Sequence, residues 1–123
     1  MANRILKETV CTSPNIEMLD WFEEVCFYRL IVQCDDYGRL DARPVLLRAK
    51  LFPLREDINT AEVECAMAHL EEAGLIERYV VEGRDYLRLS SWKRHQKVRS
   101  PRAKFPPPLA ETTYDEWSED NLT

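Results

Sequence analysis

The sequence lacks the short motifs that mark most enzyme active sites. It contains no glycine-rich phosphate loop, no Gly-x-Ser-x-Gly turn, no recognised metal-binding motif on an expected helix and no evident Cys–His dyad. These arrangements are common signatures of nucleotide chemistry, serine hydrolysis, metal catalysis and thiol catalysis. The many carboxylates fall on the faces of expected helices, where solvation accounts for them. We therefore expect that the chain is not an enzyme and binds no cofactor.

Cysteine and histidine are too scattered to predict a metal site or a disulfide framework. The sequence has no Cys-x-x-Cys pair, and the two histidines, His69 and His95, do not cluster with the cysteines. Structural zinc sites use closely spaced ligand pairs. We therefore expect no metal, and reduced, mostly buried thiols at Cys11, Cys26, Cys34 and Cys65.

Long apolar runs are also missing. No run approaches the ~18 residues that cross a membrane, and the segment from Met1 to Glu8 lacks the apolar block of a signal peptide. We expect a cytoplasmic protein with no membrane partner. Its 123 residues suit one domain plus a tail, and a hydrophobic content of 45% is ample for one small core.

The net charge of −5 is unevenly distributed along the chain. Five of the 22 Asp and Glu residues lie between Glu111 and the end, where there is no base, so the first 110 residues are balanced in charge. Residues 93–104 carry six basic side chains and no acid. The overall negative charge therefore does not exclude an anionic partner.

Proline, turn residues and charge divide the chain into four predicted segments. Residues 1–18 read as an N-terminal arm, residues 19–92 as the folded domain, residues 93–108 as a basic arm, and residues 109–123 as an acidic tail. Pro101 and the run of prolines at 106–108 preclude a long helix in the basic arm, so we expect an extended segment. The composition of the acidic tail predicts disorder.

Capping signals predict three helices in the folded domain. The first runs from Trp21 to Gln33 and begins with Asp20 and Glu23 as a capping box. The second opens at Pro44 and ends before Pro53, and the third follows the cap at Asn59 and ends at Gly74. The predicted buried positions are Phe22, Val25, Cys26, Leu30 and Ile31 in the first helix, Val45, Leu47, Leu51 and Phe52 in the second, and Val63, Ala66, Met67 and Leu70 in the third.

A β-hairpin is predicted directly after Gly74. A two-residue type II′ turn at Gly83-Arg84 pairs Val81 with Tyr86 and Val80 with Leu87, and a four-residue loop from Glu82 to Asp85 is the alternative. The expected face toward the helices holds Ile76, Val80, Leu87 and Leu89, and the expected solvent face holds Tyr79, Tyr86, Arg84 and Arg88.

Three aspartates cluster after the first helix, at Asp35, Asp36 and Asp41. A calcium loop needs alternating acidic ligands, then a glycine, then a distant glutamate, and this spacing does not fit. We interpret the segment as a turn with capping aspartates, in which Gly38 suits a positive φ.

Three helices followed by two strands predict an α+β winged helix-turn-helix fold, in which the hairpin is the wing. Such domains most often bind DNA with the third helix in the major groove, and phosphate contacts supply much of the affinity. The third helix here is acidic, with Glu62, Glu64, Glu71 and Glu72 and no Lys or Arg. We therefore expect the wing and the basic arm to contact nucleic acid instead.

The candidate nucleic-acid-binding residues are the cations of the two arms and the wing. Six cations in twelve residues can follow phosphates without reading sequence. Tyr79, Tyr86 or Trp92 could stack a base of a single strand, although packing is the commoner role of such rings. A basic segment that is merely solvated or paired with the tail is the alternative. The candidates are Arg4, Lys7, Arg84, Arg88, Lys93, Arg94, His95, Lys97, Arg99, Arg102 and Lys104.

Several sequence blocks resemble the N-terminal winged-helix domain of replication proteins from bacterial prophages. They are Phe27–Val32, Cys34–Arg39, Asp41–Pro44, Phe52–Leu54, Gly74–Ile76, Tyr86-Leu87 and Trp92-x-x-His95-Gln96-x-Val98, and the resemblance covers about residues 1–106. It implies a role in phage replication initiation or helicase loading, related to that of DnaD-like primosome proteins. The implied partners are DNA, double- or single-stranded, and a helicase or other replication proteins.

Two other hypotheses stay open. In the first, the chain is a protein–protein interaction adaptor or a transcriptional regulator, whose acidic third helix and acidic tail dock a basic partner or another copy of the chain in a homo-oligomer. In the second, the acidic tail folds onto the basic arm and competes with DNA.

Overall fold

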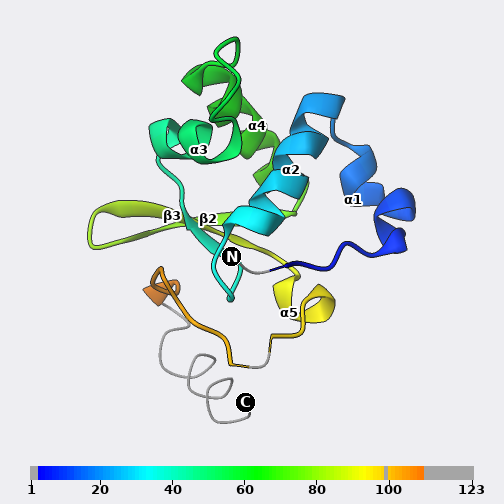
Figure 1. Ribbon diagram of the computed structural model, residues 1–123, viewed down its shortest axis with the longest axis vertical. Coiled ribbons are helices and arrows are strands. Elements are labelled where there is room, and N and C mark those ends of the chain that lie inside the picture. Colours follow the sequence, from blue (N-terminus) through cyan, green and yellow to red (C-terminus); the bar gives the residue numbers. More distant parts are fainter. Residues whose placement is uncertain (1–2, 99, 110–123) are drawn as a thin grey trace.

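The computed structural model describes residues 3–98 and 100–109. Figure 1 shows three helices on one side of a small sheet and the C-terminal part of the described chain on the other. The elements are η1 (Glu8–Thr12), α1 (Pro14–Glu17), α2 (Trp21–Gln33), β1 (Arg39–Asp41), α3 (Pro44–Leu51), α4 (Thr60–Glu72), β2 (Ile76–Val81), β3 (Arg84–Leu89) and α5 (Trp92–His95).

The three predicted helices are confirmed, and their caps form as expected. The Asp20 side chain accepts from the backbone N–H of Glu23 in α2, and the Asn59 side chain accepts from that of Glu62 in α4. Both capping boxes are complete, which satisfies backbone donors that the first helical turn leaves open. Gly74 follows α4 with a φ of 78°, a conformation that suits glycine.

The sheet is antiparallel with strand order β1-β3-β2, so the protein has a mixed helix and strand, α+β architecture. The hairpin is confirmed, but its predicted register is wrong. Val81 pairs with Arg84 across a two-residue loop at Glu82 and Gly83, where both φ angles are positive. The predicted register would oppose the like charges of Glu82 and Asp85, whereas the observed one opposes Glu77 to Arg88 and Tyr79 to Tyr86.

The core lies between the sheet and helices α2, α3 and α4. Most of the predicted buried positions are confirmed, including all four in α4. Val25 and Val45 are exceptions, with 40% and 66% of their surface exposed, and so is Val80 at 57% because it lies near the hairpin tip. The largest fully buried side chains are Phe52, Leu30, Leu47, Leu51, Met67, Leu70 and Leu87.

The four thiols divide equally between interior and surface. Cys26 and Cys34 are buried, Cys11 and Cys65 are exposed, and all four are free. Burial raises the pKa of Cys26 and Cys34 to about 12, which keeps both in the unreactive thiol form. In the part of the chain that the structure describes, no group of three or more His, Cys, Asp or Glu side chains could hold a metal ion.

None of the helices within residues 3–98 and 100–109 combines the length and the apolar character needed to cross a membrane.

Candidate nucleic-acid interface

The basic arm begins as one helical turn, α5, which is anchored by Trp92. The Trp92 ring lies against Gly38, and its Nε1 donates to the Asp36 carbonyl at 2.7 Å. A Cβ on Gly38 would come within 2.8 Å of the ring, so only glycine leaves room for the tryptophan. The Arg4 guanidinium covers the ring at 5.1 Å from its centroid. Packing thus occupies Trp92, which was a predicted candidate for base stacking.

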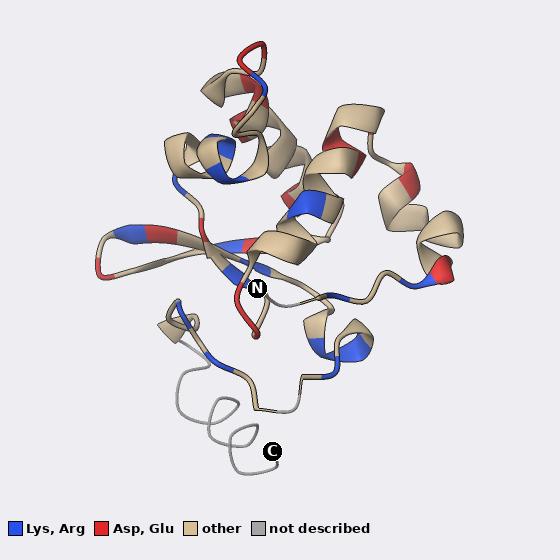
Figure 2. Cartoon of the chain, viewed as in Figure 1, with Lys and Arg blue, Asp and Glu red and all other residues tan. Residues whose placement is uncertain are grey.

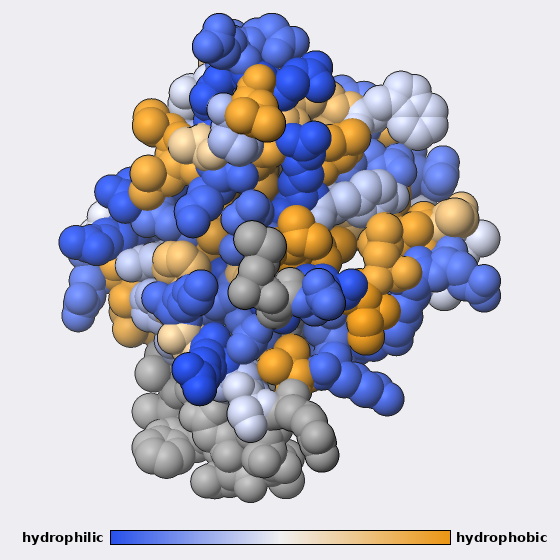
Figure 3. Space-filling view, in the orientation of Figure 1, coloured by the Kyte–Doolittle hydropathy of each residue, from blue (hydrophilic) through white to orange (hydrophobic). Residues whose placement is uncertain are grey.

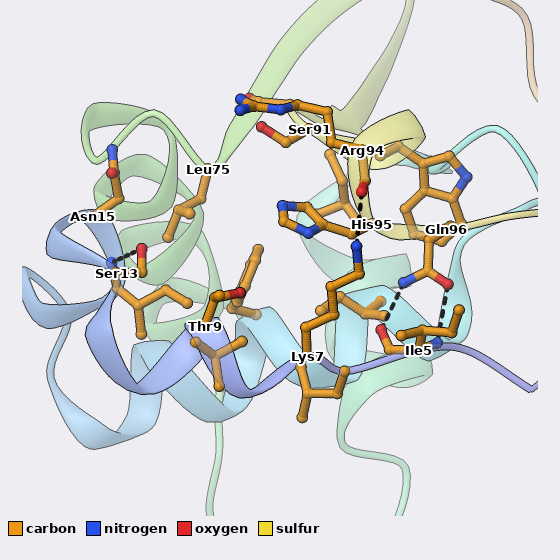
Figure 4. A pocket seen from close by; sticks show the side chains of 18 of the residues that line it. Ile5, Lys7, Thr9, Ser13, Asn15, Leu75, Ser91, Arg94, His95 and Gln96 are labelled. Atoms are coloured by element: carbon orange, nitrogen blue, oxygen red, sulfur yellow. Dashed lines mark hydrogen bonds between the residues drawn. The ribbon is translucent and has the colours of Figure 1, made fainter.

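A second anchor joins the arm to the N-terminal segment (Figure 4). The Gln96 amide donates from Nε2 to the Ile5 carbonyl at 2.7 Å and accepts from the Ile5 N–H at 3.0 Å. Lys7 donates from Nζ to the Arg94 carbonyl at 3.0 Å. The side-chain amide of Gln96 thereby satisfies both the N–H and the carbonyl of Ile5, as the backbone of a neighbouring β-strand would. These bonds hold α5 and residues 5–7 together.

Asp35 fixes the far end of the arm. Its Oδ2 accepts from the backbone N–H groups of Lys104 at 2.8 Å and Phe105 at 3.1 Å. Its Oδ1 accepts from Tyr37 at 2.9 Å and Arg39 at 3.0 Å, within the predicted turn. The Asp35 residue is only 3% exposed, so four backbone donors replace its hydration.

Asp36 reinforces this docking. Its Oδ2 accepts from the Arg102 N–H at 3.0 Å, and its Oδ1 pairs with the Arg4 guanidinium at 3.0 Å. Partial burial favours the neutral carboxyl, but the hydrogen bond from Arg102 and the Arg4 charge together hold the pKa of Asp36 below its usual value. The aspartate turn therefore serves to hold the arm, a role that sequence analysis missed.

Phe105 and Pro106 cover the sheet face that the sequence assigned to solvent. The Phe105 ring packs on Tyr86 with centroids 6.2 Å apart, and Tyr79 donates its hydroxyl to the Pro106 carbonyl. Tyr86 is buried, and burial raises the pKa of Tyr79 to about 12. The predicted solvent face is thus wrong for both tyrosines, because a segment distant in sequence packs over it.

The backbone of the arm is held at both ends, while its basic side chains stay exposed. Lys93, Arg94, His95, Lys97, Arg102 and Lys104 are all exposed. Among the described residues, no ion pair involves Arg94, Lys97, Arg102 or Lys104. Figure 2 shows these cations along the side of the molecule opposite α3 and α4. We call this set of six side chains the basic surface.

The other candidate residues have different environments. Lys7 is exposed and joined to α5, and Arg84 is exposed at the hairpin tip. Arg88 pairs with Glu77 at 2.9 Å. The Arg4 side chain is only 5% exposed and contacts Asp36, the Cys34 carbonyl and the Trp92 ring. We therefore exclude Arg4 from the basic surface. Arg99 and the acidic tail from residue 110 onward lie outside the described residues.

The acids of α4 are largely used within the chain. Arg78 pairs with Glu64 at 2.7 Å and with Glu71 at 3.0 Å, and Glu62 completes the capping box. His69 contacts the buried carboxylate of Glu23, which joins α4 to α2. The acidic character of α4 is confirmed, but three of its four predicted carboxylates serve internal contacts.

A pocket of about 410 Å³ lies beside the basic surface, between the N-terminal segment and α5. Phe27, Ile31 and Leu89 supply apolar walls, and Arg94 and His95 also border it. Figure 4 shows Lys7, His95 and Gln96 around this space. Of the residues that line it, the sequence had marked Lys7, Arg94 and His95 as candidate contacts to nucleic acid, Trp92 as a candidate for base stacking, and Ile31 and Leu89 as buried positions.

Comparison of this chain with protein-family models, with curated proteins and with solved structures finds no match.

Proposed function

We propose that this protein is a winged-helix DNA-binding protein that contacts phosphates through its basic surface and the tip of its wing, the β2–β3 hairpin. From α2 to β3, the elements follow in the order helix, strand, helix, helix, strand, strand, and β1 pairs with β3. Both features support the winged-helix assignment. The basic surface carries the proposal, because a backbone that is already fixed loses little entropy when its side chains bind an anion.

The proposed docking mode differs from groove reading by the third helix. Glu64 and Glu71 leave α4 acidic even when paired with Arg78, and phosphate would be repelled there. Phosphate contacts position a protein on DNA but carry no sequence information directly. We therefore propose binding with weak dependence on sequence.

The proposed context is replication initiation or helicase loading in a phage, following the resemblance described above. Two blocks that carry the resemblance meet in space, because Trp92 packs on Gly38 and bonds to Asp36. These blocks thus have a structural role in holding the arm. A pull-down with a purified replicative helicase tests this context separately from DNA binding.

DNA binding is tested by fluorescence anisotropy with duplex and single-stranded oligonucleotides over a range of salt. Replacing Lys97 and Arg102 by alanine should weaken duplex binding roughly five- to tenfold per cation at ~0.1 M salt and lower the salt slope by about one each. Substitution is preferred to truncation because the arm also covers Tyr86. Lys50→Ala, an exposed cation of α3, is the matched control and should leave affinity unchanged. No binding of either strand form at low salt would refute the proposal.

A further inference from the structure

The outward face of α2 is apolar, although it faces solvent. Trp21 is 82% exposed, Val32 53% and Val25 40%, and Tyr28 lies between them half-buried. The opposite face of α2 buries Cys26 and Leu30 in the core, so the helix is apolar on two sides. Apolar side chains gathered on an exposed surface often mark an interaction site. In Figure 3, hydrophobic side chains, in orange, lie among polar ones in the region of α2.

The three exposed residues and the half-buried Tyr28 follow the spacing of a coiled-coil seam. Trp21, Val25, Tyr28 and Val32 are separated by four, three and four residues, which is the alternation of d and a positions in a heptad. Val25 and Val32 then occupy a positions, and Trp21 and Tyr28 occupy d positions.

The charges beside this seam are complementary to those of a second copy. Glu24 occupies a g position and Arg29 the following e position, five residues later. In a parallel pair these two positions meet, so Glu24 of each protomer lies against Arg29 of the partner subunit on both sides of the seam. An antiparallel pair would bring like flanks together, with glutamate beside glutamate.

Both charged side chains keep hydrogen-bonding capacity for this contact. Arg29 donates from one guanidinium nitrogen to the Leu51 carbonyl at 2.7 Å, and a guanidinium has five N–H donors. Glu24 accepts the Tyr28 hydroxyl on Oε2 at 2.7 Å, which leaves Oε1 for a partner. The internal contacts hold both groups in place at the edges of the seam.

We propose that two copies of this chain associate in parallel through α2, along the seam of Trp21, Val25, Tyr28 and Val32. The helix α2 has 13 residues, fewer than two full heptads, so the dimer is weak and forms with rising protein concentration. Because α2 lies on the helical side of the sheet and the basic surface on the other, pairing leaves the proposed DNA contacts open. The inference therefore does not depend on DNA binding.

Sedimentation velocity of the full chain, from micromolar to millimolar concentration, tests the association. The wild type should shift from monomer to dimer, and Trp21→Ser combined with Val32→Ser should raise the dissociation constant at least tenfold. Leu54→Ser combined with Val80→Ser is the matched control, since these residues are 91% and 57% exposed outside α2, and it should dimerise as the wild type does. Circular dichroism verifies that each variant is folded. A wild type that stays monomeric, or an α2 variant that dimerises normally, overturns the proposal.

Disulfide trapping tests the orientation, in a chain whose exposed Cys11 and Cys65 are replaced by serine. In a parallel pair, Trp21→Cys crosslinks to itself and Val32→Cys crosslinks to itself. Crosslinks that form only when the two variants are mixed would show an antiparallel pair and overturn the proposed register.

Discussion

Asp35 is the residue on which the docking of the arm depends most. Both oxygens of its buried carboxylate accept two backbone N–H groups each. An asparagine has one accepting oxygen, and its NH₂ group would oppose two donors. Asp35→Asn should therefore lower the free energy of unfolding by about 3 kcal/mol or more, measured by urea denaturation.

The exposed Asp57 provides the control for this variant. It pairs with Arg55 at the surface, where an ion pair adds little to stability, so Asp57→Asn should change the free energy of unfolding far less than Asp35→Asn does. Limited trypsin digestion gives a second measurement, because release of the arm should speed cleavage at Lys97 and Arg102. An Asp35→Asn variant with wild-type stability and cleavage would contradict the assigned role.

The contact of His69 with Glu23 predicts a pH dependence of stability. The hydrogen bond and charge of Glu23 raise the pKa of His69 above its ordinary 6.5, so the folded state holds the proton more tightly than the unfolded state does. The contact between protonated His69 and Glu23 contributes its full stabilisation below pH 6.5. This contribution is lost as the pH rises through the higher pKa that His69 has in the folded state. The stability difference between wild type and His69→Gln should therefore shrink over that range in thermal unfolding scans. A difference that is constant with pH would contradict this coupling.

Sequence reasoning succeeded at the residue scale where an interaction is local. The capping boxes at Asp20 and Asn59 span three residues and follow from side-chain chemistry alone. It failed for Arg4, whose partners Asp36 and Trp92 are distant in sequence and leave no local pattern.

At the scale of elements, the tip of the β2–β3 hairpin stores strain in the backbone of one residue. Glu82 has a φ of 51°, which glycine and asparagine adopt more easily than glutamate does. Glu82→Asn should stabilise the protein by about 0.5–1 kcal/mol, measured by chemical denaturation. Glu77 lies within β2 and has no positive φ to relieve, so Glu77→Asn should not stabilise the protein. A neutral or destabilising effect at residue 82 would contradict the strain.

The helices were predictable as elements, whereas part of the sheet was not. Periodic apolar residues and caps specify α2 and α4 without any other part of the chain. β1 has three residues, too few for alternation to be detected, and it forms because Leu40 and its neighbours pair with β3. The hairpin register depended on the cross-strand pairs of Arg88 with Glu77 and Tyr86 with Tyr79, which local turn preferences do not encode.

At the scale of the whole molecule, the sheet is covered by helices on one face and by the arm on the other. A chain ending at Trp92 loses the backbone donors of Lys104 and Phe105 to Asp35 and uncovers Tyr86. We expect these losses to lower the free energy of unfolding by about 2 kcal/mol and the melting temperature by about 10 °C. Differential scanning calorimetry measures the melting temperature. A chain ending at Leu109 retains these contacts and should melt like the wild type. Equal melting of both truncations would contradict a structural role for the arm.

The composition of the candidate site was predictable, but its geometry was not. The six cations between residues 93 and 104 were evident from the sequence, as was the acidic character of α4. What the sequence could not indicate is that the backbone between these cations is fixed by Asp35, Asp36 and Ile5, because backbone donors carry no residue signature.

The bonds from Asp35 to Lys104 and Phe105 span 69 and 70 positions of the chain, which has a consequence during biosynthesis. Ribosomes deliver the N-terminal part first, so helices α2 to α4 and the hairpin can assemble while Asp35 still lacks two of its donors. The buried carboxylate becomes fully satisfied only after residue 105 has left the exit tunnel. Completion of the fold is thereby tied to the synthesis of the arm, and a nascent chain arrested before that point leaves Tyr79 and Tyr86 without the cover of Phe105 and Pro106.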